Sequence, residues 1–275
     1  MKIRNIALAA LFTVTTVFTA QASIIEPGFN SATLAPNDDS STGAVNIGFD
    51  VNFFGLTFSQ LFVNNNGNVT FDSALATFTP FDLTSTGRQI IAPFFADVDT
   101  RSAGDPVTYG VGSFNGMLAF GVNWLNVDYY SSSAAHTNRN SFQLLLVDRS
   151  DVSAGDFDII FNYDQIQWET GTASSGDANG LGGDSARAGY SNGTGDAGSF
   201  FELAGSAVNG AFLDGGSNAL VSNRLNSGFD GRYIFNARNG EIVVVPPTSV
   251  PEAQTIALFG LGLLLVAGIR RRKIR

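Results

Sequence analysis

The middle of the chain alternates between apolar and polar residues with a period of two, which predicts β-strands. The clearest alternating positions are Phe157, Ile159, Phe161, Tyr163, Ile166 and Trp168. The run at residues 143–147, which is apolar after Gln143, suits a central strand of a sandwich. No stretch between the two ends has a convincing helical period. The pattern therefore predicts an all-β fold, an antiparallel and sandwich-like domain.

Turn-forming residues divide these strands. Asn66-Gly67 lies between the apolar runs 61–63 and 69–71 and predicts a hairpin with a type I′ turn, because both residues tolerate the positive φ that this turn needs. Residues 171–198 are rich in Gly, Ser, Ala and Asp and are expected to be mostly loop. Residues 242–245 read as a last strand, which Pro246 and Pro247 end.

The N-terminal residues have the pattern of a secretory signal peptide. Lys2 and Arg4 precede an almost wholly apolar stretch, and Ala20 and Ala22 form a small-x-small cleavage site. We therefore expect residues 1–22 to be removed before Ser23.

The C-terminal residues read as a hydrophobic tail with a basic end. The apolar span from 253 to 269 carries no charge, and its 17 residues would form a helix about 25 Å long at about 1.5 Å per residue. That length is at the short limit for a bilayer core of about 30 Å. The basic residues after it favour a cytoplasmic end, with the rest of the chain across the membrane. These basic anchor residues include Arg270, Arg271, Arg272 and Lys273.

This tail resembles the PEP-CTERM sorting signal of Gram-negative bacteria, which combines a short motif, a hydrophobic span and a basic cluster. The motif here is Val250, Pro251, Glu252 and Ala253, and Ala253 replaces the second proline that members usually have. The resemblance implies an exosortase-type membrane protease as processing partner. An uncut tail would instead make the protein a permanently anchored surface protein.

Charge narrows the function classes. Without the two ends the chain keeps 8 Arg, no Lys and 23 acidic residues, a formal charge of −15. Nucleic-acid binding is therefore disfavoured, because it needs clustered basic residues. The absence of cysteine excludes disulfides, thiol catalysis and cysteine metal sites. Stability must come from a hydrophobic core, and acidic side chains remain available for divalent cations.

Several short segments, in order and spacing, resemble the nidogen-like (NIDO) extracellular domain over roughly residues 30 to 238. The sharpest segment is residues 92–99, which read Ala-Pro-Phe-Phe-Ala-Asp-Val-Asp. Others are residues 53–55, 61–67, 140–143, 161–163, 166–168, 188–190 and 231–235. The resemblance implies contact with extracellular matrix or cell adhesion, with no enzymatic activity and no named ligand.

Three aspartates are the candidate chemical site. Asp97 and Asp99 would point to the same side of a strand, about 6 to 7 Å apart at roughly 3.3 Å per residue, and Asp105 follows six residues later. Oxygen ligands at this spacing suit Ca²⁺, although the segment lacks the pattern of an EF-hand loop. An acid/base pair for glycoside hydrolysis is a second reading. In the third, the aspartates cap turns and pair with Arg101.

Histidine and aromatic residues offer weaker candidates. His136 is the single histidine and lies in a polar stretch, so an exposed loop residue is expected rather than a zinc ligand or a triad base. Four aromatic residues would suit either a platform for sugar rings or a protein core. They are Trp124, Tyr129, Tyr130 and Trp168. Asn- and Gly-rich loops would likewise suit polysaccharide binding or simply tight hairpins.

The sequence thus predicts an exported, non-enzymatic protein in four parts. These are a signal peptide (1–22), a nidogen-like β domain (23–245), a linker with the sorting motif (246–254) and a hydrophobic transmembrane tail (255–275). The expected role is cell–matrix adhesion or association with biofilm exopolysaccharide, at the cell surface or outside the cell. Expected partners are an exosortase, an extracellular polysaccharide or matrix protein, and the membrane through the tail. No cofactor is required, Ca²⁺ is an option, and a secreted glycan-active enzyme is the remaining alternative.

Overall fold

The computed structural model describes residues 23–101, 103–131 and 136–242. The expected signal peptide, sorting motif, basic anchor and C-terminal hydrophobic helix lie outside these residues. Within them, no helix has the length and apolar character needed to cross a membrane.

The described residues contain fourteen strands in two sheets, and every ladder between named strands is antiparallel. The larger sheet has the order β1-β7-β8-β9-β10-β13-β14, with β6 paired to β8. Its strands are β1 (Ala32–Thr33), β6 (Val98–Asp99), β7 (Thr108–Phe114), β8 (Met117–Tyr129), β9 (Asn140–Asp148), β10 (Phe157–Ile166), β13 (Arg232–Arg238) and β14 (Glu241–Ile242).

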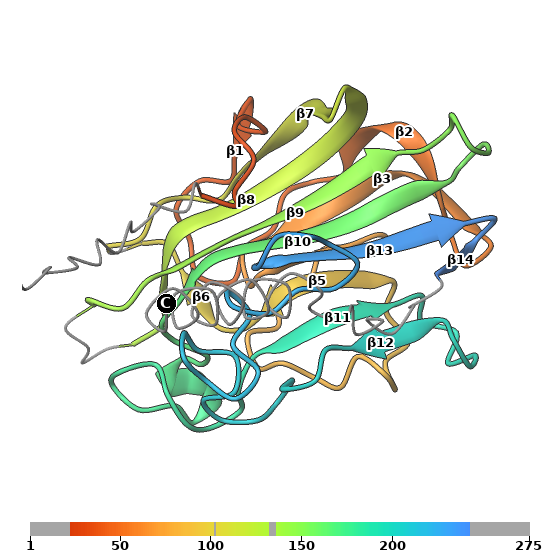
Figure 1. Cartoon of the computed structure of the whole chain (residues 1–275). Helices are drawn as coiled ribbons and strands as arrows, with labels where there is room; N and C mark the ends of the chain where they lie inside the picture. Colours follow the sequence, from red (N-terminus) through yellow and green to blue (C-terminus); the bar gives the residue numbers. More distant parts are fainter. Residues whose placement is uncertain (1–22, 102, 132–135, 243–275) are drawn as a thin grey trace, which may run out of the picture.

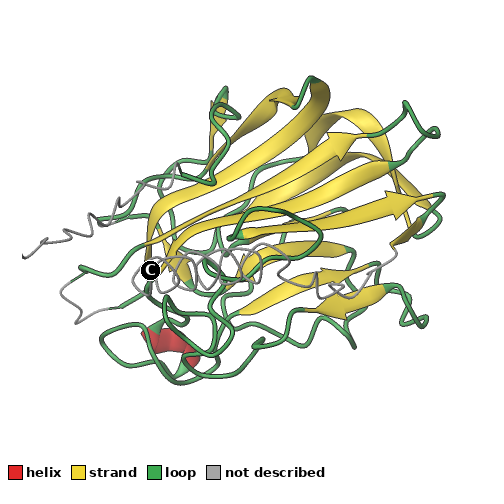
Figure 2. Ribbon diagram, in the orientation of Figure 1, coloured by secondary structure: helices red, strands yellow, loops and turns green. Residues whose placement is uncertain are grey.

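The smaller sheet has the order β12-β11-β5-β4-β3-β2. Its strands are β2 (Val45–Phe53), β3 (Leu56–Asn64), β4 (Asn68–Thr70), β5 (Ile90–Phe95), β11 (Arg187–Ser191) and β12 (Phe200–Glu202). Figure 1 and Figure 2 show the two layers of strands, with a single turn of 3₁₀ helix, η1 (Thr172–Ser174), in a long loop below them. The all-β, antiparallel prediction is confirmed.

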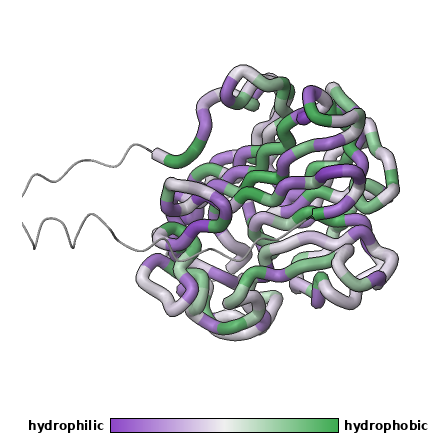
Figure 3. The backbone as a smooth tube through the Cα atoms, turned by 45° about the vertical axis from the view of Figure 1, so that its right-hand side comes forward, coloured by the Kyte–Doolittle hydropathy of each residue, from purple (hydrophilic) through white to green (hydrophobic). Residues whose placement is uncertain are grey.

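The main core fills the space between the sheets, where hydrophobic residues of both layers meet. Figure 3 shows hydrophobic and hydrophilic residues alternating along the strands, as a one-sided sheet requires. All six alternating residues predicted from the sequence are fully buried in this core. The spacing changes parity after Tyr163, and a register shift between Tyr163 and Gln165 keeps Ile166 on the inner face.

The run at residues 143–147 does form a central strand, β9, between β8 and β10. Leu144 and Leu146 face the main core, whereas Leu145 and Val147 belong to a second cluster on the outer face. Phe29 covers that outer face. A Cβ at Gly121 would lie only 2.4 Å from the Phe29 ring, so glycine makes this close packing possible.

Strand β5 is also buried on both faces, which explains its continuous apolar sequence. Ile91 and Phe94 face the main core, while Ile90 and Phe95 pack outward against residues of the preceding loop. Leu83 of that loop is fully buried. This central position makes β5 a rigid support for the residues that follow it.

The hairpin predicted at Asn66-Gly67 joins β3 and β4, but its turn type differs from the prediction. Asn64 pairs with Asn68, which leaves three residues in the turn, and Gly67 alone among them has a positive φ, at 71°. A type I′ turn needs positive φ at two residues. A Cβ at Gly67 would lie 1.7 Å from the carbonyl oxygen of Phe94, so the position excludes any larger residue.

The stretch 171–198 is mostly loop, as predicted, but it also supplies η1 and β11. Tyr190 of β11 is buried among aromatic rings, including Phe53 and Phe235. The last predicted strand begins one residue early, at Glu241, and residues 243–245 lie outside the described part.

Candidate metal centre

The candidate site lies where the chain crosses from one sheet to the other. β5 of the smaller sheet ends at Phe95, and β6, which pairs with β8 of the larger sheet, begins at Val98. Asp97 therefore sits in a bend between two strands, and the expected single strand carrying both Asp97 and Asp99 is absent from the described residues. Its backbone is fixed because the Tyr130 N–H donates to the Asp97 carbonyl oxygen at 3.0 Å.

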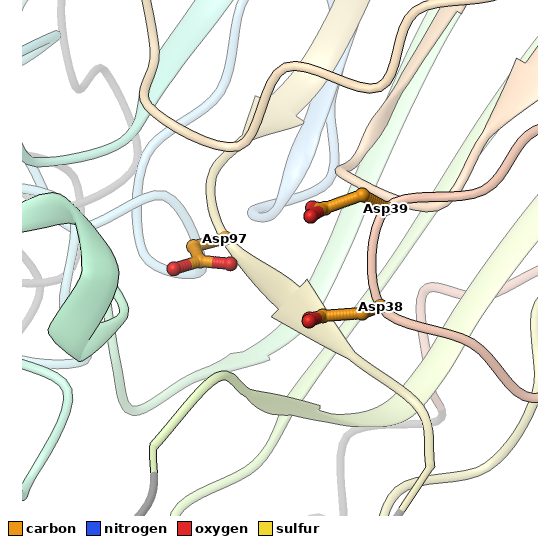
Figure 4. Close-up of side chains that lie close together, drawn as sticks. All are labelled: Asp38, Asp39 and Asp97. Carbon is orange, nitrogen blue, oxygen red and sulfur yellow. The ribbon is translucent and has the colours of Figure 1, made fainter.

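Three carboxylates meet at this crossover. Asp38 and Asp39, from the segment before β2, face Asp97, and one carboxylate oxygen from each lies within 4.8 Å of the others. Figure 4 shows the three side chains converging, with one oxygen of Asp97 turned toward Asp38 and Asp39. Sequence reasoning did not select Asp38 or Asp39, because they lie about 60 positions before Asp97 and only the fold brings them together.

Asp97 is an unusual carboxylate because it is 2% exposed and its Oδ2 is buried with no hydrogen-bond partner. Gly171 leaves room for this oxygen, since a Cβ there would lie 2.2 Å from it. Burial raises the pKa of Asp97 to about 8, and the negative charges of Asp38, Asp39 and Asp99 add to the increase. The Arg101 guanidinium opposes it only in part.

Asp38 and Asp39, unlike Oδ2 of Asp97, have side-chain partners. Oδ2 of Asp38 pairs with Arg101 at 2.9 Å, while its Oδ1 is buried without a partner. Burial and the neighbouring carboxylates raise the pKa of Asp38 to about 6, against the opposite effect of Arg101. Oδ1 of Asp39 accepts a hydrogen bond from the Asn66 side-chain amide at 2.9 Å. The cluster thus joins the segment 37–39 to both the hairpin and the crossover.

The other two predicted ligands lie outside this cluster. Asp99 accepts two hydrogen bonds from the Arg101 guanidinium, at 2.9 and 2.8 Å, which is the pairing expected in the third reading of the sequence. Asp105 is exposed and accepts from the Asn126 side chain at 3.3 Å. The structure therefore groups Asp97 with Asp38 and Asp39 instead of with Asp99 and Asp105.

Buried asparagines of the β3–β4 hairpin hold the crossover in place. The Asn65 amide donates to the carbonyl oxygens of Asp38 and Val98, both at 2.5 Å. Oδ1 of Asn66 accepts from the Val98 N–H at 2.9 Å. All four hairpin asparagines are at most 1% exposed, so their amides bind the protein itself rather than a polysaccharide. They are Asn64, Asn65, Asn66 and Asn68.

The aromatic candidates belong mainly to the core. Trp124, Trp168 and Tyr129 are at most 2% exposed, so they cannot form a platform for sugar rings. The Trp124 indole N–H donates to the Asn65 carbonyl oxygen at 3.0 Å. Tyr130 is half-buried, and the Arg101 guanidinium lies 5.8 Å from its ring centre.

His136 lies in a loop, as predicted, but it is not fully exposed. Its Nδ1 is 2.8 Å from Oδ2 of the fully buried Asp128, and its side chain is 24% exposed. Arg139 also pairs with Asp128, at 3.2 Å. The histidine thus anchors its loop to the end of β8, a structural role that the polar sequence around it did not reveal.

The described residues form an all-β sandwich, and comparison with known families identifies its class. The nidogen-like domain family matches residues 59–239, and the PEP-CTERM protein-sorting motif matches residues 249–273. The chain belongs to the nidogen-like domain family. Strands β1 and β2 precede the matched segment, yet they complete both sheets.

Curated relatives include much larger proteins. Alpha-tectorin of Mus musculus is 36% identical over 208 residues, which is 66% of this chain and 9% of the relative. Alpha-tectorin of Gallus gallus is 33% identical over 254 residues, 83% of this chain and 12% of the relative. Nidogen-2 of Mus musculus is 28% identical over 110 residues, 40% of this chain and 8% of the relative. No solved structure gives a significant match.

These matches fix the class of the protein. A nidogen-like domain followed by a PEP-CTERM motif indicates an exported protein that an exosortase sorts to the cell surface or the outside of the cell. Because the chain spans about a tenth of the length of its curated relatives, their wider activities and partners do not transfer with the family.

Proposed function

We propose that this protein is a non-enzymatic surface or extracellular-matrix component that supports cell–matrix adhesion or the association of cells with exopolysaccharide. The observation that carries the proposal is the order of its parts, a nidogen-like domain and then a sorting motif. The −15 charge of residues 23–249 supports a role at a hydrated surface, because like charges keep such a protein soluble.

The geometry of the aspartates favours this proposal over a glycan-active enzyme. Both carboxylate oxygens of Asp99 are occupied by Arg101, and Asp97 is 2% exposed. A glycosidase needs two carboxyl groups that reach opposite sides of one scissile bond. We expect Asp97→Asn to leave every glycan-cleaving activity of the culture unchanged. Loss of such an activity in the variant would instead support the alternative of a glycan-active enzyme.

The proposal has two forms, which differ in whether the tail is cut and the protein released or the tail stays and anchors it. Intact mass of the native protein, measured separately in membrane and medium fractions, distinguishes them. Release predicts an extracellular species that begins near Ser23 and lacks everything after about Pro251. Glu252→Ala should shift the protein to the membrane fraction, and Glu241→Ala, outside the motif, should not. A full-length tail found only in the membrane would establish permanent anchoring.

The adhesion role is tested by deleting the gene and measuring biofilm mass and attachment to a glycan-coated surface. Restoring the parent chain should restore both. A strain that attaches and retains exopolysaccharide normally without the protein would refute the adhesion role while leaving its sorting intact.

A further inference from the structure

The strongest unassigned feature is the carboxylate cluster at the sheet crossover. We propose that Asp38, Asp39 and Asp97 bind one Ca²⁺ ion, which ties the segment before β2 to the crossover between the sheets. The inference concerns a metal site and does not depend on the adhesion role proposed above.

The ligand atoms have the chemistry and spacing that calcium needs. All three are carboxylate oxygens, the hard donors that Ca²⁺ prefers. At Ca–O distances of roughly 2.3–2.6 Å, two ligands of one ion can be at most about 4.6–5.2 Å apart. The three oxygens lie within 4.8 Å of one another. Three oxygens placed evenly around one ion at about 2.6 Å are roughly 4.5 Å apart, so small side-chain shifts would bring all three to a single ion.

The buried and unpartnered Asp97 points independently to a ligand. Its side chain lies between Gly171 on one side and the Asp38 and Asp39 carboxylates on the other. Among the described residues no hydrogen-bond donor reaches its Oδ2, and Oδ1 of Asp38 is orphaned in the same way. A buried carboxylate without a partner is unfavourable, because it loses its hydration and gains nothing in exchange. A cation held by the Asp97 and Asp38 carboxylates would offset the negative charge that burial makes costly.

Arg101 provides only part of the required positive charge. Its guanidinium pairs with Asp99 and Asp38, so four carboxylates share one cation at this corner of the molecule. The Arg101 side chain is 49% exposed, and within the described residues no ion pair joins it to Asp97. Calcium would therefore bind beside Arg101 and share Asp38 with it.

The test is calcium titration of the full-length protein in about 0.15 M salt, which screens loosely held surface ions. Isothermal calorimetry should give one site, with a dissociation constant of roughly 10⁻⁴–10⁻³ M, as for other extracellular calcium modules. The melting temperature should rise with calcium concentration, because the ion binds the folded state. No heat of binding and no rise in melting temperature would overturn the proposal.

Variants locate the ion. Asp97→Asn and Asp39→Asn should each weaken binding by more than about tenfold, since each removes a ligand. Asp105→Asn is the matched control, because that exposed carboxylate lies outside the cluster and should leave the affinity unchanged. Equal binding by the parent and all three variants would mean a diffuse response of the acidic surface and would refute the site. If Asp97→Asn does not fold, Asp39→Asn against Asp105→Asn decides.

Discussion

The buried amide of Asn65 gives the sharpest prediction about what stabilises this fold. Asn65→Ala removes the donor to the carbonyl oxygens of Asp38 and Val98. Each buried polar group left without a partner costs about 1–3 kcal/mol, and carbonyl oxygens fall toward the lower end of that range. We therefore expect the free energy of unfolding to fall by about 2–4 kcal/mol, from a typical total of about 5–15 kcal/mol.

The measurement is urea unfolding of the full-length protein, followed by tryptophan fluorescence. Trp124 is a suitable reporter because it is fully buried and its indole bonds to the Asn65 backbone, which the substitution leaves in place. The melting temperature should fall by about 4–16 °C, at about 2–4 °C per kcal/mol for a domain of this size. Asn30→Ala, an exposed asparagine, is the control. A variant within about 0.5 kcal/mol of the parent would show that the hairpin amides do not stabilise the crossover.

Two further predictions concern the same fold. Gly67→Ala should destabilise the protein by more than the roughly 1–2 kcal/mol that a left-handed conformation costs an alanine, because the new Cβ would also clash with the Phe94 carbonyl oxygen. Gly116 also has a positive φ but has open space around it, so Gly116→Ala should show only the smaller cost. The same urea assay measures both variants. Burial raises the pKa of Glu169 above 4.5, against backbone hydrogen bonds from Phe212 and Gly210. A raised carboxyl pKa means that its contribution to stability is complete below the unfolded value and is lost as pH rises through the folded one. Urea midpoints at a series of pH values should therefore fall less steeply above pH 4.5 in Glu169→Gln than in the parent, and identical slopes would contradict the assignment.

Local sequence patterns were sufficient to predict much of the fold. The alternation along β10 and the apolar run of β9 identified buried strands, because both are properties of consecutive residues. The turn at Gly67 was located but its type was wrong, since the number of residues in a hairpin turn depends on which residues pair across it. Strand β11 was hidden in a glycine-rich stretch, where pairing with β5 outweighs a weak local preference.

The candidate site was only partly visible in the sequence. Asp97 stood out because a single residue separates it from Asp99, yet its partners come from a segment about 60 residues earlier. The spacing predicted that Asp99 would lie beside Asp97 as a second ligand. The bend at residues 96 and 97 separates the two side chains, and Asp99 instead accepts hydrogen bonds from Arg101. Adjacent acidic residues at positions 38 and 39 were a signal, but without the sheet topology nothing joined them to Asp97.

Strand β14 has a mechanical consequence. It is the last described element before the linker and tail, and it pairs with β13 through only two residue pairs. A force applied to the chain beyond Ile242 would have to break only these two pairs to separate β14 from β13. β13 behind it is held by six pairs to β10. Separation of β14 would therefore leave the β10–β13 ladder in place.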